Sequence, residues 1–324
     1  MGYENSISQD GLMKTESTRE TFGNTLVELG KSNQNIVVIG ADLNKSTFAS
    51  LFGREFPERF FDVGAAEQNM MSIAAGLAFS GKISFVNTFA VFGTSRPHDQ
   101  IRVGIAQAGA NVKIVCTHAG ITVGEDGISA QSIEDIALMC ALPGVTVIVP
   151  ADAPETAQAI KVAAREYGPF YIRLSRSSTP VIHSDGYSFQ LGKGETVREG
   201  KDVTIFATGI MVATAVESAN RLVFEGIECR VVNMATLKPL DEEIITRAAL
   251  ETGAIVTAEE HYMYGGLGSL IAQTVAKTHP VPMEVVAQDR YAESGKPELL
   301  LEKYGLSSAD IEMAVQKVVR RKGA

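Results

Sequence analysis

One acidic residue, Glu67, stands where the sequence predicts little contact with water. The stretch FDVGAAEQNMMSIAAGLAFSG predicts a helix over 67–80 that is apolar nearly all round, and such a helix is expected to be buried. Burying a carboxylate costs several kcal/mol unless another group binds it or shares its proton. Glu67 therefore either caps the free amides of the first helical turn or takes part in chemistry.

Other groups with chemical potential follow predicted strands. His118 closes the segment 112–118, where it could carry a proton, bind an anion or be structural. Asp42 and Ser46 follow the segment 35–41. Phe89 and Phe92 could be core residues, or they could offer an aromatic face to a flat heterocycle.

Three arginines are also candidates. Arg173 and Arg176 end the segment 170–175 and would point to opposite faces of a continuing strand, so that one could meet an anionic ligand. Arg19 lies in the first turn of the first long helix, where a surface charge is the default interpretation.

The elements that must position these residues alternate between strands and helices. Apolar runs separated by helix-length segments indicate an α/β fold with a parallel sheet covered on both faces, whose ligands bind at the carboxyl ends of the strands. The expected strands are 35–41, 60–64, 83–90, 112–118, 145–151, 170–175, and then 203–209, 229–237, 254–260 and 283–289. The expected helices of the first part are 18–30, 67–80, 96–108 and 154–167. We expect a flexible N-terminus (1–15), a first domain (16–178), a linker (179–192) and a smaller α/β domain (193–324).

Composition excludes several classes. The 324 residues carry a net charge of −9, which argues against a general nucleic-acid binder. No apolar run is long enough to span a membrane, and the polar start lacks the pattern of a signal peptide. The three cysteines fit neither a disulfide framework nor a zinc site. We expect a cytoplasmic chain with no metal site of its own.

The motifs VGAAEQNM, TFAVF, THAGITVGEDG, RLSR and EEHYMYGGLGS occur in an order that resembles the C-terminal half of transketolase and other thiamin diphosphate enzymes. The tail DRYAESGKPELLLEKYGL is most similar to transketolases. The resemblance implies a pyrimidine-binding domain followed by a transketolase C-terminal domain. It also implies that Glu67 binds a ring nitrogen of the cofactor.

The resemblance assigns the remaining candidates as well. Phe89 and Phe92 would flank the pyrimidine ring, with Asp42 also on the cofactor side, and His118 would face the substrate as a catalytic group. The expected substrate-binding residues are Arg19, Ser46, His118, Asp126 and Arg176. Two positions depart from the family pattern, because Ala130 replaces a histidine and Ser95 a tyrosine.

The GDG motif with which the family anchors diphosphate and Mg²⁺ does not occur here. The resemblance therefore implies the C-terminal subunit of a split transketolase, with a diphosphate-binding partner, an α2β2 assembly, sugar phosphate substrates and Mg²⁺ held mainly by the partner. Two alternatives stay open: the β subunit of a 2-oxoacid dehydrogenase, and a non-catalytic assembly subunit of the same fold.

Overall fold

The computed structural model describes residues 14–184 and 186–322. Most of the expected flexible N-terminus, 1–15, lies outside these residues. Its last residue, Thr15, belongs to strand β1 (Thr15–Glu16), which pairs antiparallel with β8 (Thr179–Pro180). The start of the described chain is thus attached to the segment that connects the two main sheets.

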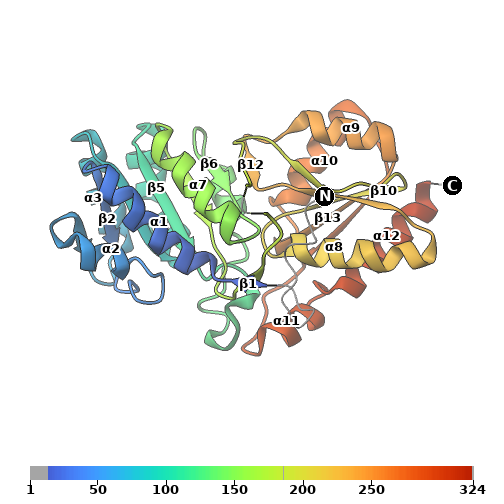
Figure 1. Cartoon of the computed structure of the whole chain (residues 1–324), viewed down its shortest axis with the longest axis horizontal. Helices are drawn as coiled ribbons and strands as arrows, with labels where there is room; N and C mark the ends of the chain where they lie inside the picture. The colour runs from blue at the N-terminus through green and yellow to red at the C-terminus, as the bar shows by residue number, and fades with distance from the viewer. Residues whose placement is uncertain (1–13, 185, 323–324) are drawn as a thin grey trace.

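A seven-stranded sheet forms the first part of the molecule, at the left of Figure 1. Six strands are parallel and one, β12, runs antiparallel to its neighbour β6. The inner strand β2 reads Ile-Val-Val-Ile-Gly and is buried throughout, as strands covered on both faces are. In sheet order the strands are β12 (Thr236–Lys238), β6 (Thr146–Ile148), β7 (Phe170–Arg173), β5 (Val112–Thr117), β4 (Ile83–Phe89), β2 (Ile36–Gly40) and β3 (Phe60–Asp62).

Two long helices, α1 (Thr18–Ser32) and α7 (Ala153–Arg165), pack together on one face of this sheet. Each begins at a side-chain cap: Ser17 accepts from the amide of Glu20, and Asp152 from the amide of Glu155. Helix α3 (Glu67–Phe79) contributes Met70, Met71 and Ala74 to a core cluster that also contains Val86 and Ile114 of this sheet. The shorter helices are α2 (Ser50–Glu55), η2 (Pro57–Arg59), α4 (Ala90–Thr94), α5 (His98–Gln100), η3 (Ile101–Gln107), η4 (Ile121–Asp126) and α6 (Asp135–Cys140).

A five-stranded sheet forms the second part of the molecule. Its strands, in order, are β14 (Met283–Gln288), β13 (Ile255–Tyr262), β10 (Val203–Ala207), β11 (Cys229–Asn233) and the antiparallel β9 (Glu195–Arg198). Helix α8 (Met211–Leu222) packs against α12 (Ser308–Lys322), and α9 (Glu242–Thr252) packs against α10 (Leu267–Thr278). The remaining helices are η5 (Val223–Glu225) and α11 (Pro297–Lys303).

The two sheets are joined by a common core cluster and by a strand from the second half of the chain. One core cluster contains Val86 and Ile114 of the first sheet together with Val232 and Ile255 of the second. The expected strand 229–237 is wrong as a single element, because it divides into β11 and β12, which belong to different sheets. The second half of the chain therefore supplies the edge strand of the first sheet.

Two predictions for the first part need correction. The expected helix 96–108 is a short α5 followed by a π-helical segment, η3. Helix α3 is not buried all round, because Gln68, Asn69 and Ser72 are exposed and Phe79 is 60% exposed. This helix therefore presents one open face on the isolated chain.

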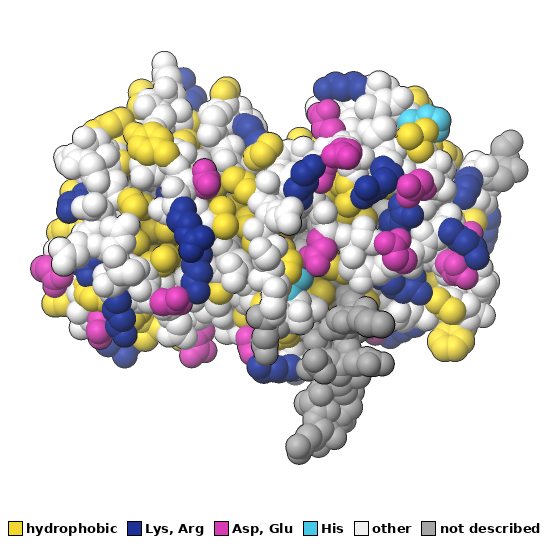
Figure 2. All heavy atoms as spheres, turned by 45° about the horizontal axis from the view of Figure 1, so that its top comes forward, with side chains coloured by type: hydrophobic (Ala, Val, Ile, Leu, Met, Phe, Trp, Pro, Cys, Tyr) yellow, Lys and Arg dark blue, Asp and Glu magenta, His cyan; other side chains and the backbone are white. Residues whose placement is uncertain are grey.

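Charged side chains of both signs are intermixed over the second part of the molecule in Figure 2. Among residues 14–184 and 186–322, no helix combines the length and the apolar character that crossing a membrane requires. In the same residues, no three His, Cys, Asp or Glu side chains gather as a metal site.

Candidate functional site

Glu67 is the first residue of α3 and is 5% exposed. Its carboxylate accepts a hydrogen bond of 2.9 Å from Nη1 of Arg96. The guanidinium of Arg96 also lies over the ring of Phe92, 4.2 Å from its centroid, while the Arg96 side chain is 53% exposed. Among the described residues Glu67 caps no helix amide, and it is not solitary, because the half-exposed guanidinium of Arg96 binds it.

Three flat side chains, Phe92, Phe89 and His118, form what we call the ring row. Phe89 ends β4, and Phe92 follows in α4. Their ring centroids are 6.0 Å apart and the planes differ by 14°. Phe89 also stacks on His118, with centroids 3.7 Å apart and planes 18° from parallel. The ring row therefore links Arg96 and Glu67 to the end of β5.

His118 is held in an unusual conformation directly after β5. Its φ is +56°, a left-handed conformation that is uncommon outside glycine, and its Nδ1 lies 2.8 Å from Oγ1 of Thr117. Burial, followed by the positive charges of Arg19 and Arg176, lowers the pKa of His118 to about 3. At neutral pH the imidazole is therefore uncharged and can exchange hydrogen bonds with a ligand.

Arg19 and Arg176, here called the arginine pair, meet at this end of the ring row. Burial and the charge of Arg176 lower the pKa of Arg19. Arg19 donates to the backbone oxygen of Ser46 at 2.6 Å, yet its buried Nε has no hydrogen-bond partner among the described residues. Arg176 is half-buried and lies 3.5 Å from Glu125. Two like charges and a free donor suit an anionic ligand.

The structure thus brings together most of the candidates. Ser46 takes part through its backbone carbonyl. The prediction that Arg173 and Arg176 lie on opposite faces of a continuing strand does not apply, because β7 ends at Arg173. Arg173 is 6% exposed and bonded to Asp135. Asp42 and Asp126 are exposed, and the structure records no contact of either with the ring row within the described residues. Ala130 is buried and Ser95 is exposed.

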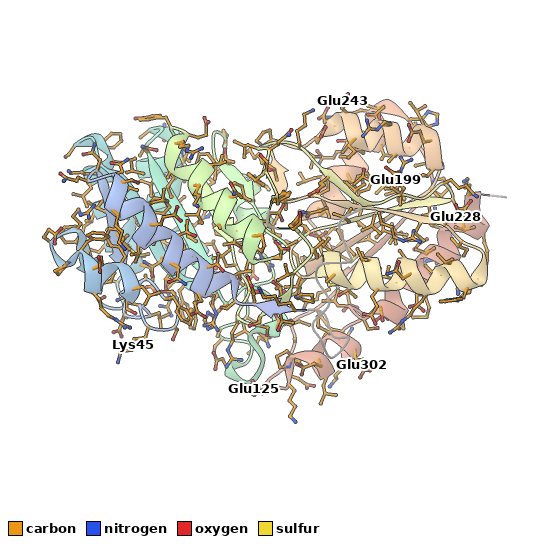
Figure 3. The ribbon with its side chains drawn as sticks, viewed as in Figure 1. Lys45, Glu125, Glu199, Glu228, Glu243 and Glu302 are labelled. Carbon is orange, nitrogen blue, oxygen red and sulfur yellow. The ribbon has the colours of Figure 1, made fainter. Side chains whose placement is uncertain are left out.

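Backbone strain is concentrated around the same loops. Among the described residues, three that are not glycine have positive φ: Asp42 at +64°, Phe48 at +62° and His118 at +56°. Asp42 and Phe48 lie in the loop after β2, and His118 follows β5. Figure 3 shows Lys45 and Glu125, which follow these two strands, at the same lower edge of the molecule. Such conformations are typical of functional loops.

The sequence did not single out Arg96. It follows the aromatic motif as one arginine among many, and only the turn after α4 brings it back over Phe92 and Glu67. The signal that could have found it is chemical, because a buried carboxylate beside aromatic faces requires a cationic or hydrogen-bonding partner.

Comparison with known proteins covers nearly the whole chain. Residues 14–181 match the pyrimidine-binding domain of transketolase, and residues 192–311 match the transketolase C-terminal domain. A putative transketolase C-terminal section of Methanocaldococcus jannaschii is 43% identical over 94% of this chain and 96% of its own length.

Two further relatives are similarly close. The 6-deoxy-6-sulfo-D-fructose transketolase subunit of a Clostridium species is 42% identical over 94% of this chain and 95% of that protein. A solved structure described as an inactive β4 tetramer of a split-gene transketolase is 50% identical. It superposes with a TM-score of 0.89 over 94% of this chain and 99% of its own.

Both family domains match in the order in which this chain carries them, and these relatives match over nearly their full lengths. The chain therefore belongs to the transketolase family and is of the type of its split C-terminal subunits.

Proposed function

We propose that this chain is the pyrimidine-binding half of a two-chain transketolase, which moves a two-carbon ketol unit between sugar phosphates. Thiamin diphosphate would lie between this chain and a partner that supplies the diphosphate-binding residues and most of the Mg²⁺ contacts. The supporting observation is the unbroken path from Glu67 through Arg96 and the ring row to the arginine pair.

The residues at the Glu67 end fit a flat nitrogen heterocycle. A planar nitrogen-rich group, the guanidinium of Arg96, already stacks on Phe92 while it donates to Glu67. An aminopyrimidine has the same two features, a flat face and nitrogen atoms that bind a carboxylate. Phe89, Phe92 and Glu67 would hold the ring, and Asp42 would lie on the cofactor side.

Thiamin diphosphate, when bound, supplies the carbon nucleophile that attacks the ketose carbonyl. Glu67, which is 5% exposed, would hold a proton at a pyrimidine nitrogen. The ring row excludes water from one side of the heterocycle. His118, uncharged at neutral pH, exchanges hydrogen bonds with the sugar.

The arginine pair and the backbone of Ser46 would bind the anionic end of the substrate, and Asp126 would contact donor hydroxyls. The Nε of Arg19, which has no hydrogen-bond partner within residues 14–184 and 186–322, supports this role. The name of the Clostridium relative includes a sulfonated sugar, and a sulfonate would satisfy the same arginines. We propose a sugar phosphate and include the sulfonated sugar among the substrates tested.

We propose residues 16–178 and 193–324 as the two domains, joined by 179–192, and an α2β2 complex with the partner. The open face of α3, with Gln68, Asn69 and Phe79, supports a subunit contact there. The inactive β4 tetramer of the 50%-identical relative supports the need for a second kind of chain.

The test is ketol transfer by this chain, by a diphosphate-binding transketolase subunit and by their mixture, with thiamin diphosphate, Mg²⁺ and a panel of ketose donors and aldose acceptors. We expect activity in the mixture alone. Ketol transfer by this chain alone would overturn the proposal that two different chains form the cofactor site. Decarboxylation of pyruvate by a mixture that transfers no ketol unit would instead establish the dehydrogenase alternative, which these transketolase relatives do not favour.

A further inference from the structure

The loop between β5 and α6, residues 118–134, begins with His118. One backbone bond ties its start to Leu174, which follows β7, and another closes the loop on itself. The amide of Ala119 donates to the carbonyl of Leu174 at 3.3 Å, and the amide of Gly120 donates to the carbonyl of Ser132 at 2.7 Å. These bonds fix the two residues that follow His118.

The second sheet also holds this loop. Glu260, in β13, is 3% exposed, and its Oε1 accepts a hydrogen bond of 2.7 Å from the amide of Thr122. Gly120 lies against this carboxylate so closely that a Cβ there would stand 2.1 Å from Cδ of Glu260, and its φ of +77° also favours glycine. The loop backbone therefore rests directly on Glu260.

Arg173 holds Glu260 in place through its guanidinium. Its Nη2 donates to the backbone oxygen of Glu260 at 2.9 Å, and its Nη1 lies 3.9 Å from the Glu260 carboxylate. Through Nε the same guanidinium donates to Asp135 at 2.8 Å. One buried arginine thus connects β7, α6 and β13, and it keeps the Glu260 carboxylate from being an uncompensated buried charge.

The far end of the loop is also attached to the second part of the chain. Ser294 donates to the carbonyl of Glu125 at 2.6 Å, and Gln131 donates to the carbonyl of Glu293 at 3.0 Å. Helix α11 packs against η4. Figure 3 shows Glu125 at the lower edge of the molecule, where Figure 1 shows α11.

We propose that the second part of the chain positions the substrate site: Glu260 fixes Gly120–Thr122 and thereby sets the place of His118. This proposal rests on the proposed function, because it takes His118 to face the sugar. Glu260 is a positioning residue and touches neither substrate nor cofactor. It acts through the loop backbone, with Ser294 and Glu293 as weaker attachments at the other end.

The neighbouring Glu259 offers a matched control. It lies on the same strand, is fully buried and also accepts backbone amides, those of Leu267 at 2.7 Å and Gly268 at 2.8 Å. Successive side chains of a strand point to opposite faces, and Glu259 accordingly caps α10 while Glu260 holds the loop. Burial raises the pKa of both carboxyls.

The experiment compares Glu260→Met with Glu259→Met in the full chain, alone and reconstituted with the partner. Hydrogen exchange of peptides covering 119–124 needs no substrate, so it tests the attachment even if the mixture transfers no ketol unit. We expect Glu260→Met to speed exchange there ~10-fold, as loss of one charged acceptor permits. The KM for the sugar phosphate should rise ~10-fold with thiamin diphosphate affinity unchanged.

Glu259→Met should speed exchange in 267–271 instead and leave the KM unchanged. Glu260→Gln, which keeps an acceptor oxygen and the side-chain shape, should fall between wild type and Glu260→Met, and it serves as the test if the Met variant does not fold. Unchanged exchange of 119–124 in the Glu260 variants, or equal KM changes in the Glu259 and Glu260 variants, would overturn the proposal.

Discussion

The two ends of the ring row are held in different ways. At the Glu67 end, the contact that closes the site is made by Arg96, a long side chain that is 53% exposed. At the His118 end, backbone hydrogen bonds and buried groups from both sheets fix the chain before any ligand arrives. We infer that the part of the site proposed to recognise substrate, near His118, is pre-organised. The part proposed to bind the cofactor, near Glu67, is instead occupied by the half-exposed side chain of Arg96.

The largest effect should come from removing the carboxylate at the Glu67 end. Glu67→Ala should lower ketol transfer by the reconstituted complex by at least ~10²-fold, the range of general acid–base contributions. Steady-state rates measured beside those of Glu58→Ala, which removes an exposed carboxylate, would check this. Unchanged turnover in Glu67→Ala would favour a non-catalytic assembly subunit.

At the fixed end, Arg176→Ala should raise the KM for phosphorylated sugars ~10-fold and leave unphosphorylated sugars nearly unaffected, because one charged hydrogen-bond donor is lost. The measurement is the ratio of the two KM values, with Arg165→Ala as the control for an exposed arginine. An equal rise for both classes of sugar would refute a role in phosphate binding.

Removing the Arg96 cation should have a smaller effect, and it should strengthen cofactor binding instead of weakening function. Arg96→Ala frees Glu67 and the face of Phe92, so the Kd of thiamin diphosphate in the complex should fall ~3–10-fold, as the loss of one exposed ion pair and one cation–π contact allows. Arg102→Ala, which breaks the exposed pair with Asp99, is the control in a titration followed by calorimetry. Weaker binding in Arg96→Ala would mean that this arginine serves the cofactor directly.

The smallest effect concerns pH. The pKa of His118 is about 3 in the folded chain, below the ordinary value of 6.5, so the unfolded chain binds more protons between these values. Stability contributed by neutral His118 is therefore present above pH 6.5 and is lost as the pH falls toward 3. His118→Asn should reduce the loss of unfolding free energy between pH 7 and 5 by about 1–2 kcal/mol in urea titrations. An identical loss in wild type and variant would show that burial and the arginine pair do not lower the pKa of this imidazole in the folded chain.

The sequence predicted the parallel strands and the long helices well, because apolar runs such as residues 36–40 and capping residues such as Asp152 are local signals. It failed where partners distant in sequence decide the outcome. Nothing local divides 229–237 between two sheets, and nothing local brings Arg96 to Glu67. The residue types alone also leave the roles of Phe89 and Phe92 open, because aromatic residues at this spacing are common in cores.

The strand β12 has a consequence for dissecting the molecule. A chain cut between residues 181 and 192 would deprive the first fragment of β12 and leave the hydrogen-bonding groups along β6 without their neighbour. Such a bare edge recruits strands from other molecules, so the first fragment is expected to aggregate when it is produced alone. Calorimetry of the intact chain should accordingly record one melting peak, because the first sheet is incomplete without β12 and one core cluster contains residues of both sheets.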